Sequence, residues 1–152
     1  MSRIALLDVN VLVALFDPDH LHHEVAHDWF EENRTSGWAT CPLTENGFVR
    51  VLGNLARSGE FVPIPELVDR LRTFRASGHH EFWPDAISLC DERLFDLSLA
   101  RGHRQLTDVY LLGLAVKRHG LLVTFDQKVP LGAVKGARRD TLEVVAFAEP
   151  RT

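Results

Sequence analysis

The sequence predicts an α/β fold, arranged as a three-layer α/β/α sandwich around a central, mainly parallel sheet. Three observations support this prediction. Short apolar segments alternate with longer amphipathic ones along the chain, as they do in strand–helix–strand units. The strand-like segments are apolar almost throughout, which is typical of parallel strands covered on both faces. The length of 152 residues suits one domain, residues 1–152, whose core is large enough to need no disulfide.

The first forty residues predict two strands separated by two helices. Residues 4–8 are short and apolar and predict a buried strand. Residues 9–16 continue apolar and predict a helix that begins directly after Asp8 and is interrupted by a proline. Residues 20–33 predict a more polar helix with apolar side chains at helical spacing. The segment GWATC, residues 37–41, predicts the second strand.

The middle of the chain predicts three helices and one weaker strand. Residues 44–55 predict a helix with Thr44 as its cap. Residues 66–77 predict the next helix, directly after two prolines, which the first turn of a helix tolerates. Residues 81–83 predict a third, weaker strand, and residues 86–90 predict a short helix.

The last third of the chain carries the strongest helix pattern. Residues 105–119 predict a helix capped by Thr107 and ended by Gly120, with cationic side chains in its last turn. The segment LLVTFD, residues 121–126, predicts a buried strand, and LEVVAF, residues 142–147, predicts the last one.

Histidine and cysteine residues are present, but not at the spacing of a metal site. Cys41 and Cys90 match no zinc pattern, and we interpret them as core thiols in a reducing cytoplasm. Four histidines lie in the predicted helix over residues 20–33: His20, His22, His23 and His27. We interpret them as a solvated face, because no cysteine or acidic cluster completes a ligand set.

Composition argues against two classes of protein. The net charge is −4 with neutral histidines, whereas nucleic-acid binding usually accompanies a basic surface. A bound cation can still contact phosphate in place of Lys and Arg. No apolar stretch approaches the roughly 20 residues that span a membrane, and the first residues lack the pattern of a signal peptide. We therefore expect a cytoplasmic protein with no membrane partner.

Four acidic residues lie where predicted strands end and helices begin. Asp8 ends the first strand and Asp126 ends LLVTFD, and ligands of parallel sheets bind beyond such strand ends. Asp108 lies at the start of a helix, and the chain returns from that helix along the strand to Asp126. Glu45 lies in the first turn of the helix after the second strand. We therefore expect the four carboxylates to converge at one edge of the sheet.

Converging carboxylates raise one another's pKa unless a counter-charge is present. Hard divalent cations such as Mg²⁺ or Mn²⁺ prefer oxygen ligands and keep water ligands that a substrate phosphate can replace. The chemistry that one or two such ions favour is phosphodiester hydrolysis, because the metal activates water and stabilises the in-line transition state.

The same stretches resemble the PIN domain, and specifically VapC-type toxin ribonucleases of toxin–antitoxin modules. The matching segments are LLDVNVLVALF, CPLTENGFVRVL, LTDVYLLGLAVKRHGLLVTFD and the ending VVAF. They occur in the family's order and at similar separations, so the resemblance covers essentially the whole chain. It implies a Mg²⁺- or Mn²⁺-dependent endoribonuclease with an α/β/α sandwich.

The resemblance also implies a role for each site residue. Asp8, Glu45, Asp108 and Asp126 match the family's acidic quartet. Asp8 and Asp108 would be the principal metal ligands, and Asp126 would complete the site, often through water. Glu45 would bind metal or orient the attacking water. One departure is the sequence TFDQKVP, because many relatives follow the last acid with a small or acidic residue.

Three polar residues are expected to support the quartet. Asn10 matches the polar helper two positions after the first acid. Thr107 and Thr124 are expected to supply hydroxyls next to the metal ligands, although a helix cap and a strand residue explain them equally well. The family further implies three partners: an RNA substrate, a second copy of the chain in a homodimer, and a VapB-type antitoxin that covers the acidic pocket with a helix and a basic side chain.

Other functions of a parallel α/β sheet fit the sequence less well. A phospho-receiver signalling module needs an adjacent acidic pair after the first strand, but Val9 follows Asp8. An aspartyl-phosphate phosphatase needs an aspartate two residues after the first, where Asn10 stands. A catalytically silent PIN-like binding module stays open as the alternative, and the presence of all four acids argues against it.

Overall fold

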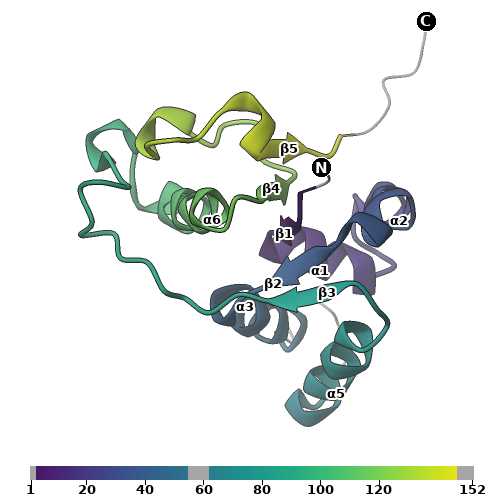
Figure 1. Ribbon diagram of the computed structural model, residues 1–152. Coiled ribbons are helices and arrows are strands. Elements are labelled where there is room, and N and C mark those ends of the chain that lie inside the picture. Colours follow the sequence, from purple (N-terminus) through teal and green to yellow (C-terminus); the bar gives the residue numbers. More distant parts are fainter. Residues whose placement is uncertain (1–2, 55–61, 147–152) are drawn as a thin grey trace, which may run out of the picture.

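The computed structural model describes residues 3–54 and 62–146, and within them it shows the predicted α/β fold. Five strands form one sheet in the order β3-β2-β1-β4-β5, and every pair is parallel (Figure 1). The strands are β1 (Ala5–Leu7), β2 (Trp38–Thr40), β3 (His80–Phe82), β4 (Leu121–Thr124) and β5 (Leu142–Val144). The predicted strands over residues 4–8, 37–41, 81–83, 121–126 and 142–147 are thereby confirmed, with bounds shorter or shifted by a residue or two. Phe147 lies outside the described residues.

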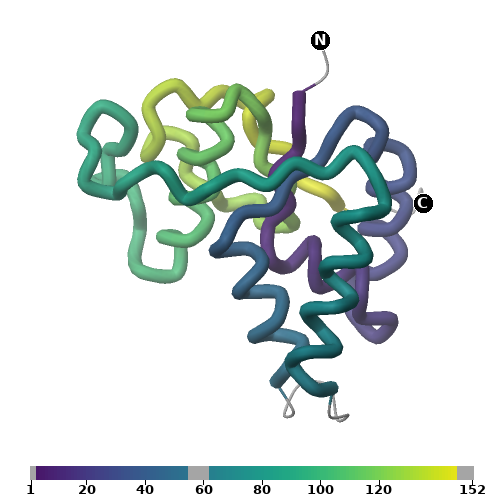
Figure 2. Tube along the Cα trace, turned by 60° about the horizontal axis from the view of Figure 1, so that its bottom comes forward, coloured from purple at the N-terminus to yellow at the C-terminus, as the bar shows by residue number. Residues whose placement is uncertain are grey.

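Within the described residues, five α-helices accompany this sheet. They are α1 (Val9–Phe16), α2 (His23–Asn33), α3 (Pro42–Leu52), α5 (Ile64–Arg75) and α6 (Leu106–Lys117). Figure 1 shows α6 on one face and α1 and α2 on the other. Figure 2 shows that α3 and α5 run side by side away from the sheet. The arrangement is the predicted three-layer sandwich.

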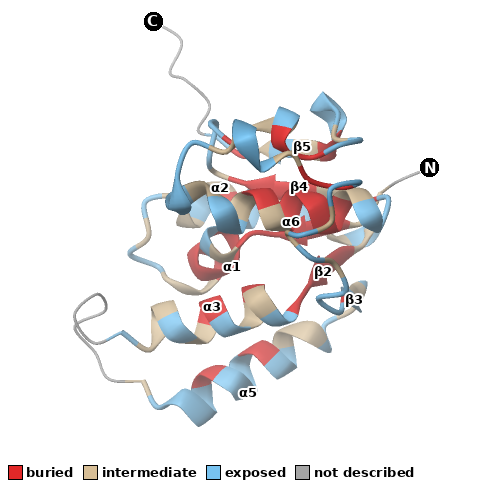
Figure 3. Ribbon diagram, turned by 90° about the vertical axis from the view of Figure 1, so that its left-hand side faces the viewer, coloured by how far each residue is buried: buried red, intermediate tan, exposed pale blue. Residues whose placement is uncertain are grey.

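Side chains of the central strand alternate between two hydrophobic clusters. Leu6 packs with α6, whereas Ala5 and Leu7 pack with α1 and α2. All three residues of β1 are buried, because helices cover both faces of the parallel sheet. Figure 3 shows the same burial along the strands and on the inner turns of α1 and α6. The apolar character of the strand segments follows from this double coverage.

The chain reverses its direction across the sheet between β1 and β4. From β1 it passes to β2 and β3 at one edge, and it then returns through α6 to β4, on the other side of β1. Leu7 pairs with Val123 at the end of these two strands. Parallel α/β sheets bind their ligands at such a reversal, beyond the carboxyl ends of the strands. Asp8 and Asp126 follow these two strands.

Two helix predictions are corrected by the structure. The helix predicted over residues 20–33 begins only at His23, and Leu21 lies in the preceding turn with 76% of its surface exposed. Residues 86–90 form no helix. The hydroxyl of Ser88 instead accepts a hydrogen bond from the backbone N–H of Cys90, a local bond that competes with helix formation.

The predicted helix caps at Thr44 and Thr107 are also wrong. α3 begins at Pro42, and the Thr44 hydroxyl accepts a hydrogen bond from the backbone N–H of Cys41, the residue before the helix. α6 begins at Leu106, after a short 3₁₀ turn, so Thr107 lies inside its first turn. Glu45 and Asp108 still occupy the first turns of their helices, as predicted. Leu55, the predicted end of the third helix, lies outside the described residues.

α6 ends at Lys117, before the predicted stop at Gly120, and Gly120 instead allows the chain to enter β4. His119 takes the left-handed conformation that closes the helix, with φ of 56°. A Cβ on Gly120 would lie 2.4 Å from the carbonyl oxygen of Ile4 and 2.6 Å from the Trp83 ring. Glycine therefore allows the chain to enter β4 closely against β1. Within the described part of the chain, the helices are too short or too polar to cross a membrane.

Candidate active site

Asp8 is a buried carboxylate held at three points between β1 and α1. Its side chain accepts a 2.7 Å hydrogen bond from the N–H of Val9, the first residue of α1, and so caps that helix. Its other oxygen accepts a 2.8 Å hydrogen bond from the Thr124 hydroxyl at the end of β4. Its backbone N–H donates to the carbonyl of Val123. Only 4% of Asp8 is exposed, and this burial raises its pKa despite the two hydrogen bonds to the side chain.

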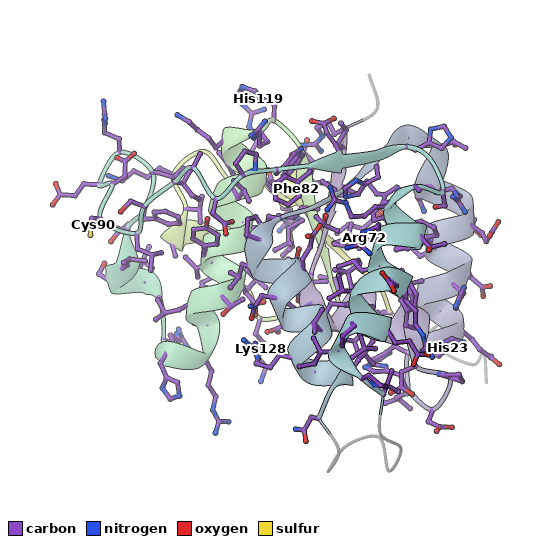
Figure 4. The ribbon with its side chains drawn as sticks, turned by 90° about the horizontal axis from the view of Figure 1, so that it is seen from below. His23, Arg72, Phe82, Cys90, His119 and Lys128 are labelled. Carbon is purple, nitrogen blue, oxygen red and sulfur yellow. The ribbon has the colours of Figure 1, made fainter. Side chains whose placement is uncertain are left out.

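Asp126 lies on the turn that follows β4. Its backbone N–H donates to the Thr124 hydroxyl at 3.1 Å, so this hydroxyl bridges Asp8 and the turn. The carboxylate of Asp126 accepts a hydrogen bond from the N–H of Lys128, and Asp126 itself is exposed. Figure 4 shows Lys128, which follows this turn, at one end of the molecule and His119, which precedes β4, at the opposite end.

Asp108 joins these two carboxylates from the first turn of α6. Its side chain is hydrogen-bonded to Asp126. Burial, the negative charges of Asp8 and Asp126, and this hydrogen bond together raise the pKa of Asp108 to about 7. The prediction that the path along α6 and back through β4 brings Asp108 close to Asp126 is confirmed.

The oxygen donors of Asp8, Asp108 and Asp126 fit a hard divalent cation. Each carboxyl in this group has a raised pKa or raises that of a neighbour, which is the repulsion that a cation relieves. As they stand, no three His, Cys, Asp or Glu side chains in residues 3–54 and 62–146 are gathered tightly enough to hold a metal ion. A cation bound among these carboxyls would relieve the burial and charge repulsion that raise the pKa of Asp108.

Glu45 has partners of its own on β2 and α5. One of its oxygens lies 3.2 Å from the guanidinium of Arg75 in the last turn of α5. The same oxygen accepts a 2.6 Å hydrogen bond from the Thr40 hydroxyl at the end of β2. The expected proximity is therefore observed for three of the four carboxylates, and the place of Glu45 beside them stays a prediction.

The Thr40 hydroxyl also contacts an imidazole. It lies 2.7 Å from Nε2 of His80, the first residue of β3. Burial and the positive charge of Arg75 lower the pKa of His80 to about 4, so its ring is neutral near pH 7. This polar cluster therefore joins the end of β2 to the start of β3.

The three predicted supporting residues differ in their positions. Thr124 contacts both Asp8 and the Asp126 turn, as described above. Thr107 is exposed in the first turn of α6, next to Asp108, and Asn10 is exposed in the first turn of α1. A hydrogen bond from Asn10 to the site stays a prediction.

The histidines of residues 20–27 are only partly a solvated face. The imidazoles of His23 and His27 donate to the carbonyls of Ala14 and Leu15, at 2.6 and 2.8 Å, in the last turn of α1. They satisfy backbone acceptors that a helix end leaves unpaired. The ring of His22 stacks on Phe125 at 4.4 Å between centroids. These contacts explain the cluster without a metal.

The two cysteines are free thiols in different surroundings. Cys41 is buried at the end of β2, as expected of a core thiol, and burial raises its pKa to about 11. A neutral thiol is a poor nucleophile, so Cys41 does not suit covalent catalysis. Cys90 is exposed and points away from the body of the molecule (Figure 4), so the prediction that it lies in the core is wrong.

Sequence reasoning missed two polar pairs near the site. Arg75 approaches Glu45 from the last turn of α5, 30 residues along the chain, and no local pattern in the sequence signals this pairing. Asp85 and Tyr110 lie within hydrogen-bonding reach of each other, beside the start of α6. Their separation of 25 residues likewise hides the contact.

Comparisons with known proteins agree with this geometry. The sequence model of the PIN domain family matches residues 5–134. Ribonuclease VapC44 of Mycobacterium tuberculosis is 44% identical over 138 residues, which cover 91% of this chain and 96% of that protein. Ribonuclease VapC38 of the same organism is 48% identical over 126 residues, covering 83% and 87%. Ribonuclease VapC39 is 39% identical over 132 residues, covering 87% and 95%. The chain therefore belongs to the PIN-domain family, in the VapC group of that family.

Proposed function

We propose that this protein is a toxin endoribonuclease of a type II toxin–antitoxin system that hydrolyses RNA phosphodiester bonds with a divalent metal, Mg²⁺ or Mn²⁺. The observation that carries the proposal is the group of three aspartates at the reversal point of the sheet, where burial and neighbouring negative charges raise the pKa of Asp8 and Asp108. Negative charges brought together in this way suit a bound cation, and the relatives named VapC are ribonucleases.

Asp8 and Asp108 are the residues that would hold the cation. Asp8 is the more rigid of the two, because Val9 and Thr124 fix both of its oxygens. Asp126 is exposed and would complete the site directly or through water. When bound, the cation would polarise the phosphate and activate water for in-line attack.

Glu45 would act at the edge of this site rather than among the metal ligands. Thr40 and Arg75 orient its carboxylate, which leaves it suited to position the attacking water or to accept its proton. Arg75 itself has 38% of its side chain exposed and could contact the RNA backbone.

The test is RNA cleavage by Asp8→Asn and Asp108→Asn variants of the purified protein, with Mg²⁺ or Mn²⁺ present. Each substitution keeps the side-chain shape and removes one charge, and the cleavage rate should fall by about 100-fold or more. The matched control is Asp28→Asn on the exposed surface of α2, which should cleave at the wild-type rate. If Asp8→Asn protein cut RNA at the normal rate, the proposed mechanism would be wrong.

The same proposal extends to partners and location. A VapB-type antitoxin would neutralise the acidic site with a basic side chain, and the toxin would act as a homodimer. Its free thiols, Cys41 and Cys90, suit the reducing cytoplasm. Co-expression with the neighbouring small open reading frame should abolish growth inhibition, and the molar mass of the purified toxin should be twice that of one chain.

A further inference from the structure

A small pocket lies at the start of α6, the helix whose first turn carries Asp108. It has a volume of about 310 Å³ and lies between the start of α3, the start of α6 and the segment that follows β3. Its lining residues are Leu43, Asp85, Leu89, Leu106, Thr107 and Tyr110. Thr107 immediately precedes Asp108, and Leu43 lies two residues before Glu45. A group bound here would be next to a phosphate held at the carboxylates.

The pocket combines apolar walls with one polar edge. Leu43, Leu89 and Leu106 supply aliphatic surface, and Leu106 is 36% exposed although it is a large apolar residue. Asp85 and Tyr110 supply the polar edge, with the phenol in hydrogen-bonding reach of the carboxylate. Its volume is at the lower end of the range for ligand sites, which suits a flat group the size of one nucleobase.

The polar edge selects for hydrogen-bond donors. A carboxylate accepts hydrogen bonds at about four lone-pair sites, more than the Tyr110 phenol within its reach can occupy. The phenol therefore orients Asp85 and leaves acceptor sites for a ligand. Two neighbouring N–H groups on the ligand would match the two carboxylate oxygens.

We propose that this pocket binds a guanine base of the RNA next to the bond that is cut, with Asp85 accepting hydrogen bonds from guanine N1–H and the N2 amine. This inference rests on the proposed ribonuclease function. On its Watson–Crick edge, guanine presents two adjacent donors, whereas adenine, cytosine and uracil each place an acceptor opposite one of the oxygens. Bases in unpaired RNA are read on this edge and rest against side chains of the pocket.

The first test measures cleavage of short RNAs that differ only in the base beside the cut. Wild-type protein with Mn²⁺ should prefer guanine by about tenfold or more, and inosine, which lacks the N2 amine, should lose part of that preference. In Asp85→Asn the preference for guanine over adenine should disappear. Glu92→Gln, which removes a negative charge from the same exposed segment outside the pocket, should keep it. A wild-type enzyme without preference for guanine, or an Asp85→Asn variant that keeps it, would overturn the proposal.

The second test does not depend on cleavage. Guanosine 5′-monophosphate, added to the full chain without metal, should shift the backbone NMR signals of Leu106, Thr107 and Tyr110 in wild type but not in Asp85→Asn. Equal shifts with adenosine 5′-monophosphate would overturn the pocket assignment. If guanosine monophosphate binds in this pocket but the protein cuts no RNA, the proposed ribonuclease function is wrong and the assignment of the pocket as a guanine site stands. If RNA is cut without base preference, the pocket assignment fails alone.

Discussion

Replacing Thr124 by valine tests how Asp8 is held. The Thr124 hydroxyl donates a 2.8 Å hydrogen bond to the buried Asp8 carboxylate and accepts one from the N–H of Asp126. Valine has nearly the same shape and makes neither bond. A hydrogen bond to a charged group contributes about 1.5–3 kcal/mol, so Thr124→Val should lower the free energy of unfolding by about 2 kcal/mol. For a chain of this length, that corresponds to a fall of roughly 4–8 °C in Tm.

The assay is urea denaturation at pH 8 without metal, together with calorimetric titration of Mn²⁺. Thr124→Val should also bind Mn²⁺ about tenfold more weakly, because Asp8 loses the donor that favours its charged form. Thr124→Ser restores the hydroxyl and should restore the affinity. Thr141→Val is the matched control, because Thr141 is a buried threonine whose hydroxyl accepts from the N–H of Arg138, away from the aspartates. It should lose stability while keeping its affinity for Mn²⁺. A Thr124→Val variant with wild-type stability and wild-type Mn²⁺ affinity would refute the reasoning.

Three further predictions follow from the same geometry. The pKa of Asp108 is raised from 3.8 to about 7, so this carboxyl favours the metal-free fold fully below pH 3.8 and loses that contribution as pH rises through 7. Thermal denaturation should therefore show a smaller drop in Tm between pH 6 and pH 8.5 for Asp108→Asn than for wild type, and equal drops would contradict it. Arg75→Gln removes the cation beside Glu45 and should lower the free energy of unfolding by about 1 kcal/mol or less. RNA turnover should fall while the affinity for Mn²⁺ stays unchanged. Weaker Mn²⁺ binding would instead place Glu45 among the metal ligands. A Cβ on Gly47 would lie 2.6 Å from Cγ2 of Val9, so Gly47→Ala should cost about 1–3 kcal/mol in urea denaturation, and Val9→Ala should relieve that cost.

The sequence predicts the central strands β1, β2 and β4 well because helices bury them on both faces, whereas the edge strands β3 and β5 are partly exposed. Strands buried on both faces are apolar without interruption, and this pattern identifies β1 and β4 directly. Helix starts are less predictable, because they depend on which local hydrogen bonds form. Thr44 bonds back to Cys41 from inside α3, and Ser88 bonds locally where a helix was expected.

The acidic site is predictable only as far as strand order determines it. Asp8, Asp108 and Asp126 come together because β1, β4 and the start of α6 meet at the reversal point, and chain topology implies this meeting. The partner of Glu45 depends on how α5 packs against α3. That packing brings Arg75 to Glu45 across 30 residues of sequence, and no periodic pattern in the sequence predicts the pairing. The proximity of Asp85 to Tyr110 is likewise not predictable from the sequence, because it depends on tertiary packing.

The most direct measurement is a crystal structure of the protein grown with Mn²⁺, with the ion located by its anomalous scattering. If Asp8 and Asp108 share a cation, the anomalous difference map should show one strong peak within bonding distance of carboxylate oxygens of both residues, with Asp126 beside it. Crystals of the Asp8→Asn variant should show no such peak. Mn²⁺ bound at the histidines of residues 20–27 instead, or aspartates that stay without an ion at saturating Mn²⁺, would contradict a shared cation.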